Sequence, residues 1–291
     1  MKKTTLLFII VIFFLITLSI LILKPNKLTN TFDNDKVQKE QYSEEERKLK
    51  ELNNINKKIN YFNLSYIDRY ISYKNKNKTL PLEQVILNVN MNLDYKFYEN
   101  IKPSPSKYSN NVLVNKYYYL DNSYIPKNLT YISKDYSTKT IQVTKDTNIA
   151  FEKLVEDAKK NNLTIVAISG YRSYYYQENL YNNYVENDSK EKADTYAARP
   201  GHSEHQTGLT IDVSNGELPF TRFDETEEFN WMVNNAHNYG FILRYKKDTE
   251  NITGYSYESW HYRYVGIDIA TEIYNKNITY EEYYTKKIEK Y

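Results

Sequence analysis

The sequence predicts an α+β domain in which a small, mostly antiparallel sheet is flanked by helices, preceded by an N-terminal transmembrane helix. The α+β class follows from two observations: helical apolar spacing and short β-branched runs alternate from about residue 145, and turn residues separate them. A charge-free apolar run at 4–23 predicts the transmembrane helix.

This apolar run would span roughly 30 Å as a helix, which is enough to cross a bilayer. Lys24 and Pro25 follow it, and no cleavage site of small residues is present. A buried core helix rarely contains so long an apolar run. We therefore expect an uncleaved signal anchor at 1–24.

Three further regions follow the anchor. Residues 25–60 are rich in Asn, Lys and Glu and have too few apolar positions for a core, which predicts a solvated stalk. Residues 61–110 carry apolar side chains at helical spacing and form a helical lead-in of unknown role. Residues 111–291 are expected to form the main domain.

Within the main domain, apolar periodicity and turn residues predict each element in order. The expected elements are a strand at 112–114, a loop at 120–129, a helix at 149–158, a strand at 163–168, helices from 173 and at 190–198, a strand at 209–213, a helix at 229–239, strands at 241–243 and 262–265, and two short C-terminal helices.

The composition excludes several kinds of site. The chain has 291 residues, 39 basic and 37 acidic side chains, no cysteine and four histidines. Without cysteine there are no disulfides, thiolate metal sites or cysteine nucleophiles. The net charge of +2 argues against a nucleic-acid partner. Any metal must be bound by His, Asp or Glu.

All four histidines lie between His202 and His261, and their surroundings indicate a metal site. His205 and Asp212 are too far apart on a straight helix or strand to share an ion, so the chain must turn between them. Gly208 lies where that turn is needed. With His261 as a third ligand, one zinc ion would keep an open position for water, as in catalytic sites.

Glu258 lies three residues before His261. On a straight strand these two side chains would point to opposite faces, so we expect Glu258 in the turn that enters the strand. From there its carboxylate would face the open zinc position and act as general base, while Trp260 would point away from the metal as a core or pocket residue.

These patterns resemble a known enzyme group. The segments Ser203-x-His205-x-x-Gly208-x-x-x-Asp212 and Glu258-x-Trp260-His261-x-Arg263-Tyr264 are similar to the paired signature of the LAS zinc peptidases, which include lysostaphin-type and D-Ala-D-Ala peptidases and the hedgehog fold. Ser-Gly-Tyr-Arg-Ser at 169–173 and Arg199-Pro200-Gly201 resemble the VanY-type D-alanyl-D-alanine carboxypeptidases. The similarity covers about residues 110–280. Thr210 and Ser259 stand where that group commonly has Ala and Pro.

The resemblance implies roles for individual residues. It makes His205, Asp212 and His261 the zinc ligands and Glu258 the base, and it places Arg172 at the reacting carbonyl. A guanidinium there would stabilise the oxyanion or bind a substrate carboxylate, and the sequence does not separate these uses.

Other polar residues receive weaker assignments. Gln177 and Ser203 are candidate substrate-binding residues, although either could instead be a helix cap or a support for the ligands. His202 is expected beside the site, and His237 is expected to be structural.

The resemblance implies a zinc carboxypeptidase that removes the C-terminal D-alanine from peptidoglycan stem peptides. Such a substrate places the catalytic domain outside the cytoplasm, on a single-pass protein of the cell membrane. Three alternatives stay open: an L,D-carboxypeptidase, an endopeptidase acting within the stem peptide, and a wall-binding module without turnover. The sequence does not indicate the oligomeric state.

Overall fold

The computed structural model of the chain describes residues 54–55 and 58–289. The predicted anchor at 1–24 and most of the predicted stalk at 25–60 lie outside the described residues. In the part of the chain that is described, no helix is both long and apolar enough to cross a membrane. From Asn63 onward the chain forms one compact unit. The boundary expected at 110 stays a prediction.

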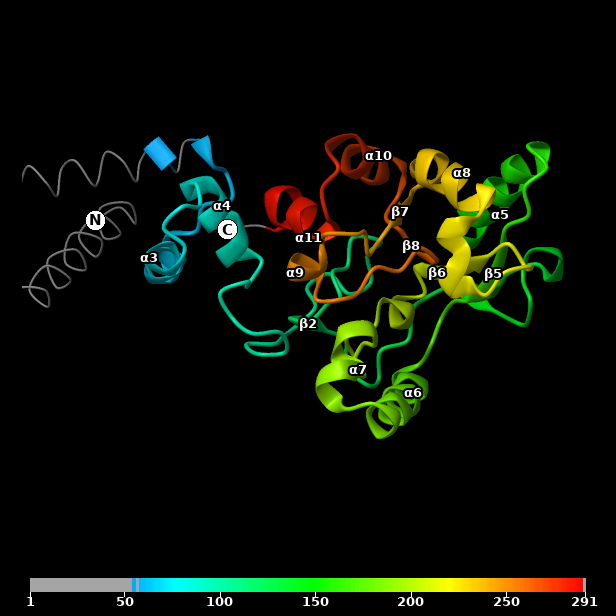
Figure 1. Cartoon of the computed structure of the whole chain (residues 1–291), viewed down its shortest axis with the longest axis horizontal. Helices are drawn as coiled ribbons and strands as arrows, with labels where there is room; N and C mark the ends of the chain where they lie inside the picture. Colours follow the sequence, from blue (N-terminus) through cyan, green and yellow to red (C-terminus); the bar gives the residue numbers. More distant parts are fainter. Residues whose placement is uncertain (1–53, 56–57, 290–291) are drawn as a thin grey trace, which may run out of the picture. The chain divides into compact units, whose positions relative to one another are not determined.

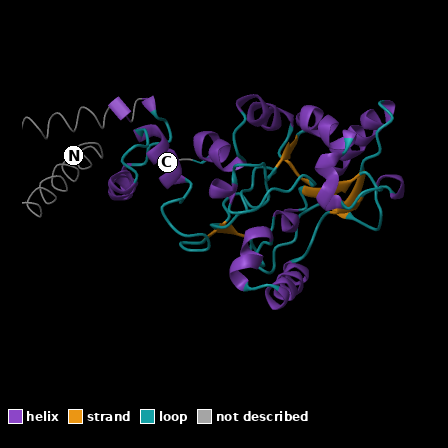
Figure 2. Cartoon of the chain, in the orientation of Figure 1, coloured by secondary structure: helices purple, strands orange, loops and turns teal. Residues whose placement is uncertain are grey.

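A four-stranded sheet lies at the centre of this unit, in the order β5-β6-β8-β7. Its strands are β5 (Val166–Ser169), β6 (Thr210–Ser214), β7 (Phe241–Leu243) and β8 (His261–Tyr264). All neighbouring pairs are antiparallel. Figure 2 shows these short strands surrounded by helices and long loops. The structure confirms the α+β class and the antiparallel sheet.

The two faces of the sheet have different surroundings. Ile211, Val213 and Tyr262 point into the main hydrophobic core, which also contains residues of α5 (Lys145–Lys160) and α8 (Glu227–Asn235). These two helices lie beside β5 and β6 in Figure 1. Because side chains alternate along a strand, Asp212 and His261 point to the opposite face. The core thus fixes the strands that present the polar residues.

Side-chain caps explain where several helices begin. Ser173 accepts a hydrogen bond from the backbone of Tyr176 at the start of α6 (Tyr174–Asn187), as the sequence predicts. Thr279 forms a capping box with Glu282 at α11 (Tyr280–Tyr283).

The remaining elements are α3 (Ile67–Lys76), α4 (Leu82–Asn90), β1 (Lys102–Pro103), β2 (Tyr118–Tyr119), β3 (Leu129–Tyr131), β4 (Gln142–Thr144), α7 (Lys190–Tyr196), α9 (Glu250–Thr253) and α10 (Ile267–Lys276).

Two expected elements differ from the structure. The strand predicted at 112–114 is wrong, because this buried segment pairs with side chains instead of a neighbouring strand: the Val112 carbonyl accepts from Arg263 and the Leu113 carbonyl accepts from Ser104. The strand predicted at 163–168 begins only at Val166.

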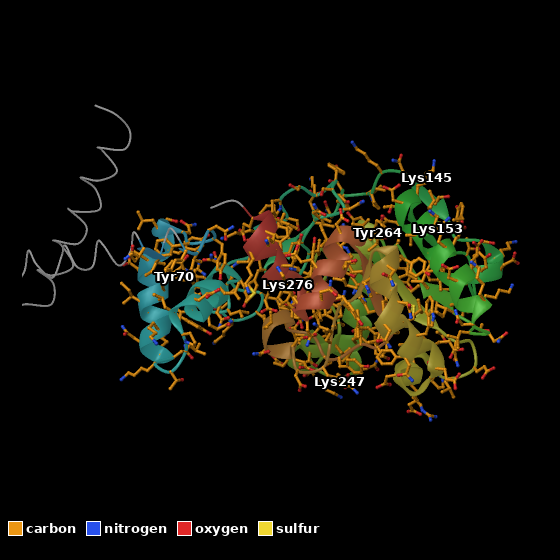
Figure 3. All side chains as sticks on the ribbon, turned by 90° about the horizontal axis from the view of Figure 1, so that it is seen from above. Tyr70, Lys145, Lys153, Lys247, Tyr264 and Lys276 are labelled. Atoms are coloured by element: carbon orange, nitrogen blue, oxygen red, sulfur yellow. The ribbon has the colours of Figure 1, made fainter. Side chains whose placement is uncertain are left out.

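The predicted lead-in at 61–110 contacts a lysine that, unlike most lysines of the unit, is buried. Lys145, Lys153, Lys247 and Lys276 are exposed around the unit (Figure 3). By contrast, Lys116 is 1% exposed, and its ammonium donates to Tyr98 and lies 3.6 Å from the Tyr255 ring centre. Burial lowers the pKa of Lys116 to about 7. Through Tyr98, the segment at 61–110 thus contacts the domain that carries the site.

Candidate metal centre

The three predicted zinc ligands come from three neighbouring elements. His205 lies in a 3-10 turn (Glu204–Thr207), and Asp212 and His261 are opposite each other on β6 and β8. Gly208 ends the 3-10 turn with φ 69°, and an added Cβ would lie 3.1 Å from the Leu129 side chain. The reversal predicted between His205 and Asp212 is confirmed, and it depends on glycine.

The ligand atoms of these residues lie within reach of one ion. His205 Nε2 is 3.3 Å from Asp212 Oδ2, and His261 Nδ1 is 3.3 Å from Asp212 Oδ1. One ligand atom from each of the three residues lies within 4.8 Å of the others. In a tetrahedral zinc site, nitrogen and oxygen ligands at about 2.0–2.2 Å from the ion lie about 3.5 Å from one another. The two 3.3 Å separations are close to that value.

The hydrogen bonds of His205 fix which ring nitrogen faces the centre. Its Nδ1 donates to the Gly170 carbonyl at 2.7 Å, because a carbonyl only accepts. Nε2 therefore carries the lone pair, and it lies 3.3 Å from Asp212 Oδ2. Burial and the nearby Arg172 guanidinium lower the pKa of His205 to about 4, so the ring is neutral at pH 7.

The Asp212 carboxylate gives the clearest sign that this centre can bind a cation. Burial raises its pKa, but His205, His261 and Arg172 outweigh that effect and hold the pKa well below its usual value. Among the described residues, Asp212 Oδ1 is buried and accepts no hydrogen bond. A buried, ionised and unpaired oxygen is costly unless a cation binds it. His205, His261 and this carboxylate together offer three ligand atoms for one zinc ion.

Glu258 lies in the turn before β8, as the sequence predicts. Its Oε2 is 3.3 Å from His261 Nδ1, and its side chain is 13% exposed. Burial raises the pKa of Glu258 above its usual value, while His261 acts in the opposite direction. A carboxylate with a raised pKa next to a metal centre is suited to accept and return a proton near neutral pH.

Arg172 contacts the same centre from the loop after β5. Its Nη2 donates to Asp212 Oδ2 at 2.8 Å and to His205 Nε2 at 3.0 Å. Gln177 accepts from Arg172 Nη1 at 3.3 Å and donates to the Ala198 carbonyl at 2.9 Å. Gln177 therefore orients Arg172, and its contact with substrate stays a prediction.

The remaining predicted residues lie around the centre. Ser203 lies in the wall of the cavity that also contains Arg172 and Glu258, and it precedes the 3-10 turn that carries His205. His202 is buried and donates from Nδ1 to the Asn115 carbonyl at 2.7 Å, away from the ligands. His237 stacks on Tyr274 with ring centres 3.9 Å apart, consistent with a structural role.

The polar centre opens into a cavity of about 390 Å³. Arg172 and Glu258 lie in its wall, and aromatic side chains form much of the rest. These aromatic residues are Tyr184, Tyr196, Phe220, Tyr245, Tyr255, Tyr257 and Trp260. Phe220 and Trp260 meet edge to face, with ring centres 5.0 Å apart. The cavity therefore offers charged groups for a peptide terminus beside apolar walls.

Sequence reasoning missed Glu204, which is fully buried directly behind His261. Its Oε2 lies 3.4 Å from His261 Nε2, and its Oε1 accepts from Arg244 and Arg263. Burial raises the pKa of Glu204, but the two guanidiniums outweigh it and hold the pKa below its usual value. One sequence pattern could have indicated these buried charges: a charged residue directly after an apolar run, as in Arg244 after Phe241-Ile242-Leu243.

Comparison with known proteins agrees with this geometry. The family model of VanY, D-alanyl-D-alanine carboxypeptidase, matches residues 140–267, which include all three ligands and Glu258. A VanY D,D-pentapeptidase variant solved in complex with Zn(II) is 31% identical, with a TM-score of 0.52, over 60% of this chain and 98% of that one. The chain belongs to the VanY family.

Other relatives define how far the likeness extends. The LdcB LD-carboxypeptidase structure is 36% identical with a TM-score of 0.62, covering 66% of this chain and 93% of that one. YodJ of Bacillus subtilis is 40% identical over 181 residues, which is 60% of this chain and 66% of YodJ. The chain spans only 51% of a D-alanyl-D-alanine carboxypeptidase of Enterococcus faecalis, at 37% identity. VanY-family likeness is concentrated in the domain that holds the metal centre.

Proposed function

We propose that this protein is a zinc-dependent carboxypeptidase that removes the C-terminal D-alanine from peptidoglycan stem peptides. The observation that carries this proposal is the convergence of His205, Asp212 and His261 with Glu258 and Arg172 in one cavity. The VanY family model and the Zn(II)-bound VanY relative support it.

The chain's own residues divide the chemistry. His205, Asp212 and His261 would hold the zinc ion, which supplies Lewis-acid polarisation of the scissile carbonyl and acidifies water. Glu258 takes a proton from the attacking water and returns it to the amine of the departing D-alanine. The intact Glu258 argues against a wall-binding module without turnover, because binding alone needs no base.

Arg172 has two possible partners in this reaction. Its guanidinium already donates to the ligands, so it lies within reach of charge that develops beside them. We assign it to the reacting carbonyl, where donors aimed at the oxyanion contribute most to the rate. Ser169 Oγ accepts from Arg172 Nε at 3.2 Å and, with Gln177, holds the side chain in place.

The decisive experiment compares substrates with and without a chelator. Purified protein is incubated with stem pentapeptide, tetrapeptide and cross-linked peptide, and the products are identified by mass spectrometry. We expect release of D-alanine from pentapeptide, lost after chelation and restored by zinc. Release from tetrapeptide alone would overturn the D-Ala-D-Ala assignment.

An L,D-carboxypeptidase is the second candidate, and a specific likeness favours it. The structure of the LdcB LD-carboxypeptidase matches this chain with a TM-score of 0.62. Both activities release D-alanine and use the same centre, so they differ only in the residue that precedes the scissile bond. The tetrapeptide arm separates them, and cleavage of the cross-linked peptide would indicate an endopeptidase.

We also propose that the protein is a single-pass membrane protein whose catalytic domain lies outside the cytoplasm. The charge-free run at 4–23 and the extracytoplasmic substrate support this location. Protease added to intact protoplasts should remove the catalytic domain from the membrane fraction. Protection of the domain until the cells are lysed would contradict the proposal.

A further inference from the structure

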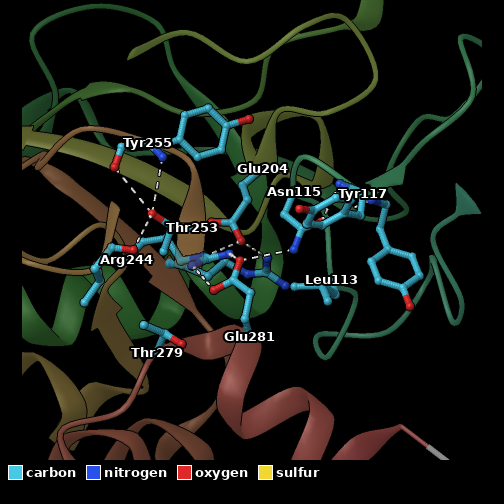
Figure 4. A network of polar contacts seen from close by, with 12 residues as sticks. Leu113, Asn115, Tyr117, Glu204, Arg244, Thr253, Tyr255, Thr279 and Glu281 are labelled. Atoms are coloured by element: carbon cyan, nitrogen blue, oxygen red, sulfur yellow. Dashed lines mark hydrogen bonds and ion pairs between the residues drawn. The ribbon is translucent and has the colours of Figure 1, made fainter. Parts of the chain in front are cut away.

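A cluster of buried charges lies behind His261, and Glu204 is its one member that also lines the cavity. Glu204, Arg244, Arg263 and Glu281 form this cluster, called here the Glu204 network. Figure 4 shows Glu204 and Glu281 converging on Arg244 from different elements. The side chains of Glu204, Arg244 and Arg263 are 0% exposed and that of Glu281 is 3% exposed.

Every charge in the Glu204 network has a partner. Arg244 donates from Nε to Glu204 Oε1 at 2.8 Å and from Nη1 and Nη2 to Glu281 at 2.8 and 2.6 Å. Arg263 donates from Nη1 to Glu204 Oε1 at 2.9 Å. Its Nη2 donates to backbone carbonyls, including that of Val112 at 2.7 Å. The two arginines therefore balance the two glutamates.

The two arginines leave one oxygen of Glu204 for His261. Both donate to Oε1, while Oε2 lies 3.4 Å from His261 Nε2. A carboxylate flanked by two guanidiniums only accepts hydrogen bonds, so His261 Nε2 must carry the proton. In the neutral ring, which is the form that binds a metal, the lone pair is then on Nδ1, and Nδ1 faces Asp212 Oδ1 and Glu258 Oε2 at 3.3 Å each.

The two histidine ligands are thus held in different ways. His205 donates from Nδ1 to a neutral carbonyl and presents Nε2, whereas His261 donates from Nε2 to a carboxylate and presents Nδ1. A carboxylate partner makes an imidazole a stronger metal ligand than a carbonyl partner does.

We propose that Glu204 is a positioning residue that fixes the tautomer and orientation of His261 for zinc binding. Arg244 and Arg263 both donate to Glu204 Oε1 and keep the carboxylate in place, while Glu281 of α11 pairs only with Arg244 among these charges. This proposal rests on the zinc-dependent function proposed above.

The first test measures zinc affinity in full-length protein, by competition with a chromophoric chelator. Glu204→Gln removes the charge, and Glu204→Asp keeps the charge but withdraws the carboxylate from His261. We expect each variant to bind zinc 10–100-fold more weakly than wild type, as for other partners of metal-ligating histidines. Wild-type affinity in either folded variant would overturn the proposal.

Glu281→Gln is the matched control, because it breaks the same network one residue further from His261. It should lower the unfolding temperature but leave zinc affinity within about threefold of wild type, since Glu204 keeps Arg263. If Glu281→Gln weakened zinc binding as much as the Glu204 variants, Glu204 would have only a structural role.

A second measurement needs no variant at Glu204. With ¹⁵N-labelled histidine, only four imidazoles contribute signals, and His261→Gln assigns one of them. In zinc-loaded wild type, His261 should show a protonated Nε2 and His205 a protonated Nδ1. A protonated Nδ1 on His261 would overturn the proposal. Failure of wild type to bind zinc would instead refute the proposed function.

Discussion

Two clusters of buried charge meet at His261, and they differ in how their polar atoms are paired. In the Glu204 network, both carboxylates accept from guanidiniums at 2.6–2.9 Å. In the metal centre, the ligand atoms face one another at 3.3 Å, and Asp212 Oδ1 accepts no hydrogen bond within the described residues. The first cluster is complete with protein atoms alone, and the second fits a cation.

This difference separates structural from functional polar groups. A buried ion pair that is fully hydrogen-bonded holds the surrounding segments in one arrangement, and losing one partner leaves a charge uncompensated. A buried acceptor without a donor costs free energy in the metal-free protein. Substitution of Glu281, which does not contact His261, should therefore affect stability, whereas substitutions in the centre, and of Glu204 beside it, should affect metal binding or turnover.

The largest expected effect is on turnover. Glu258→Gln should lower kcat for D-alanine release by about 10³-fold or more, because the amide cannot accept a proton. Zinc affinity and unfolding temperature should stay near those of wild type. The exposed Glu250 provides the control, since Glu250→Gln should leave kcat unchanged. If Glu258→Gln kept wild-type activity, Glu258 would not be the general base.

The next effect concerns stability. Glu281→Gln should lower the free energy of unfolding by about 3–5 kcal/mol, because the buried guanidiniums of Arg244 and Arg263 would then share the single carboxylate of Glu204. Urea unfolding of the metal-free protein measures this change. The control is Glu225→Gln, in an ion pair with Arg222 whose side chains are 50% and 54% exposed. That substitution should cost about 0–1 kcal/mol, and equal costs would contradict the comparison.

Arg172 connects the metal centre to the substrate. Arg172→Lys should lower kcat/KM by about 10²-fold, because lysine cannot donate to the carbonyl and to Gln177 in the same geometry. A fall in kcat with little change in KM is expected for contact with the oxyanion. A rise in KM alone would show instead that Arg172 binds the substrate carboxylate.

The smallest predicted effect is the pH dependence of stability through His202. Burial lowers the pKa of His202 to about 4, below the unfolded value of about 6.5, so the unfolded state binds more protons between these values. Stability should therefore fall on acidification, by about 2 kcal/mol between pH 6.5 and 5. In His202→Gln, the free energy of unfolding should change less between pH 6.5 and 5 than in wild type. An unchanged pH dependence would argue against a lowered pKa of His202.

Local patterns predicted much of the metal centre. His205, Gly208 and Asp212 lie within one turn and strand, and the Glu258–His261 spacing predicted a turn before a strand. The start of α6 was predicted at Ser173, which the structure shows as its cap. These features depend on neighbours in sequence, so spacing and residue type were enough.

Long-range pairing explains what the sequence did not predict. Glu204 contacts Arg244 across 40 positions, and Arg263 reaches the carbonyl of Val112 across 151. No local spacing reports such partners, so Glu204 was missed and 112–114 was assigned to a strand. The anchor at 1–24 and the location that it implies stay predictions.

The most direct test of the account is a zinc titration of metal-free protein followed by calorimetry. Wild type should bind one zinc ion, and release of D-alanine should reach its full rate at one equivalent. Asp212→Asn should lose this binding, because its amide brings no negative charge to the centre. Zinc binding retained in Asp212→Asn, or full activity without zinc, would contradict the assignment of His205, Asp212 and His261 as the metal centre.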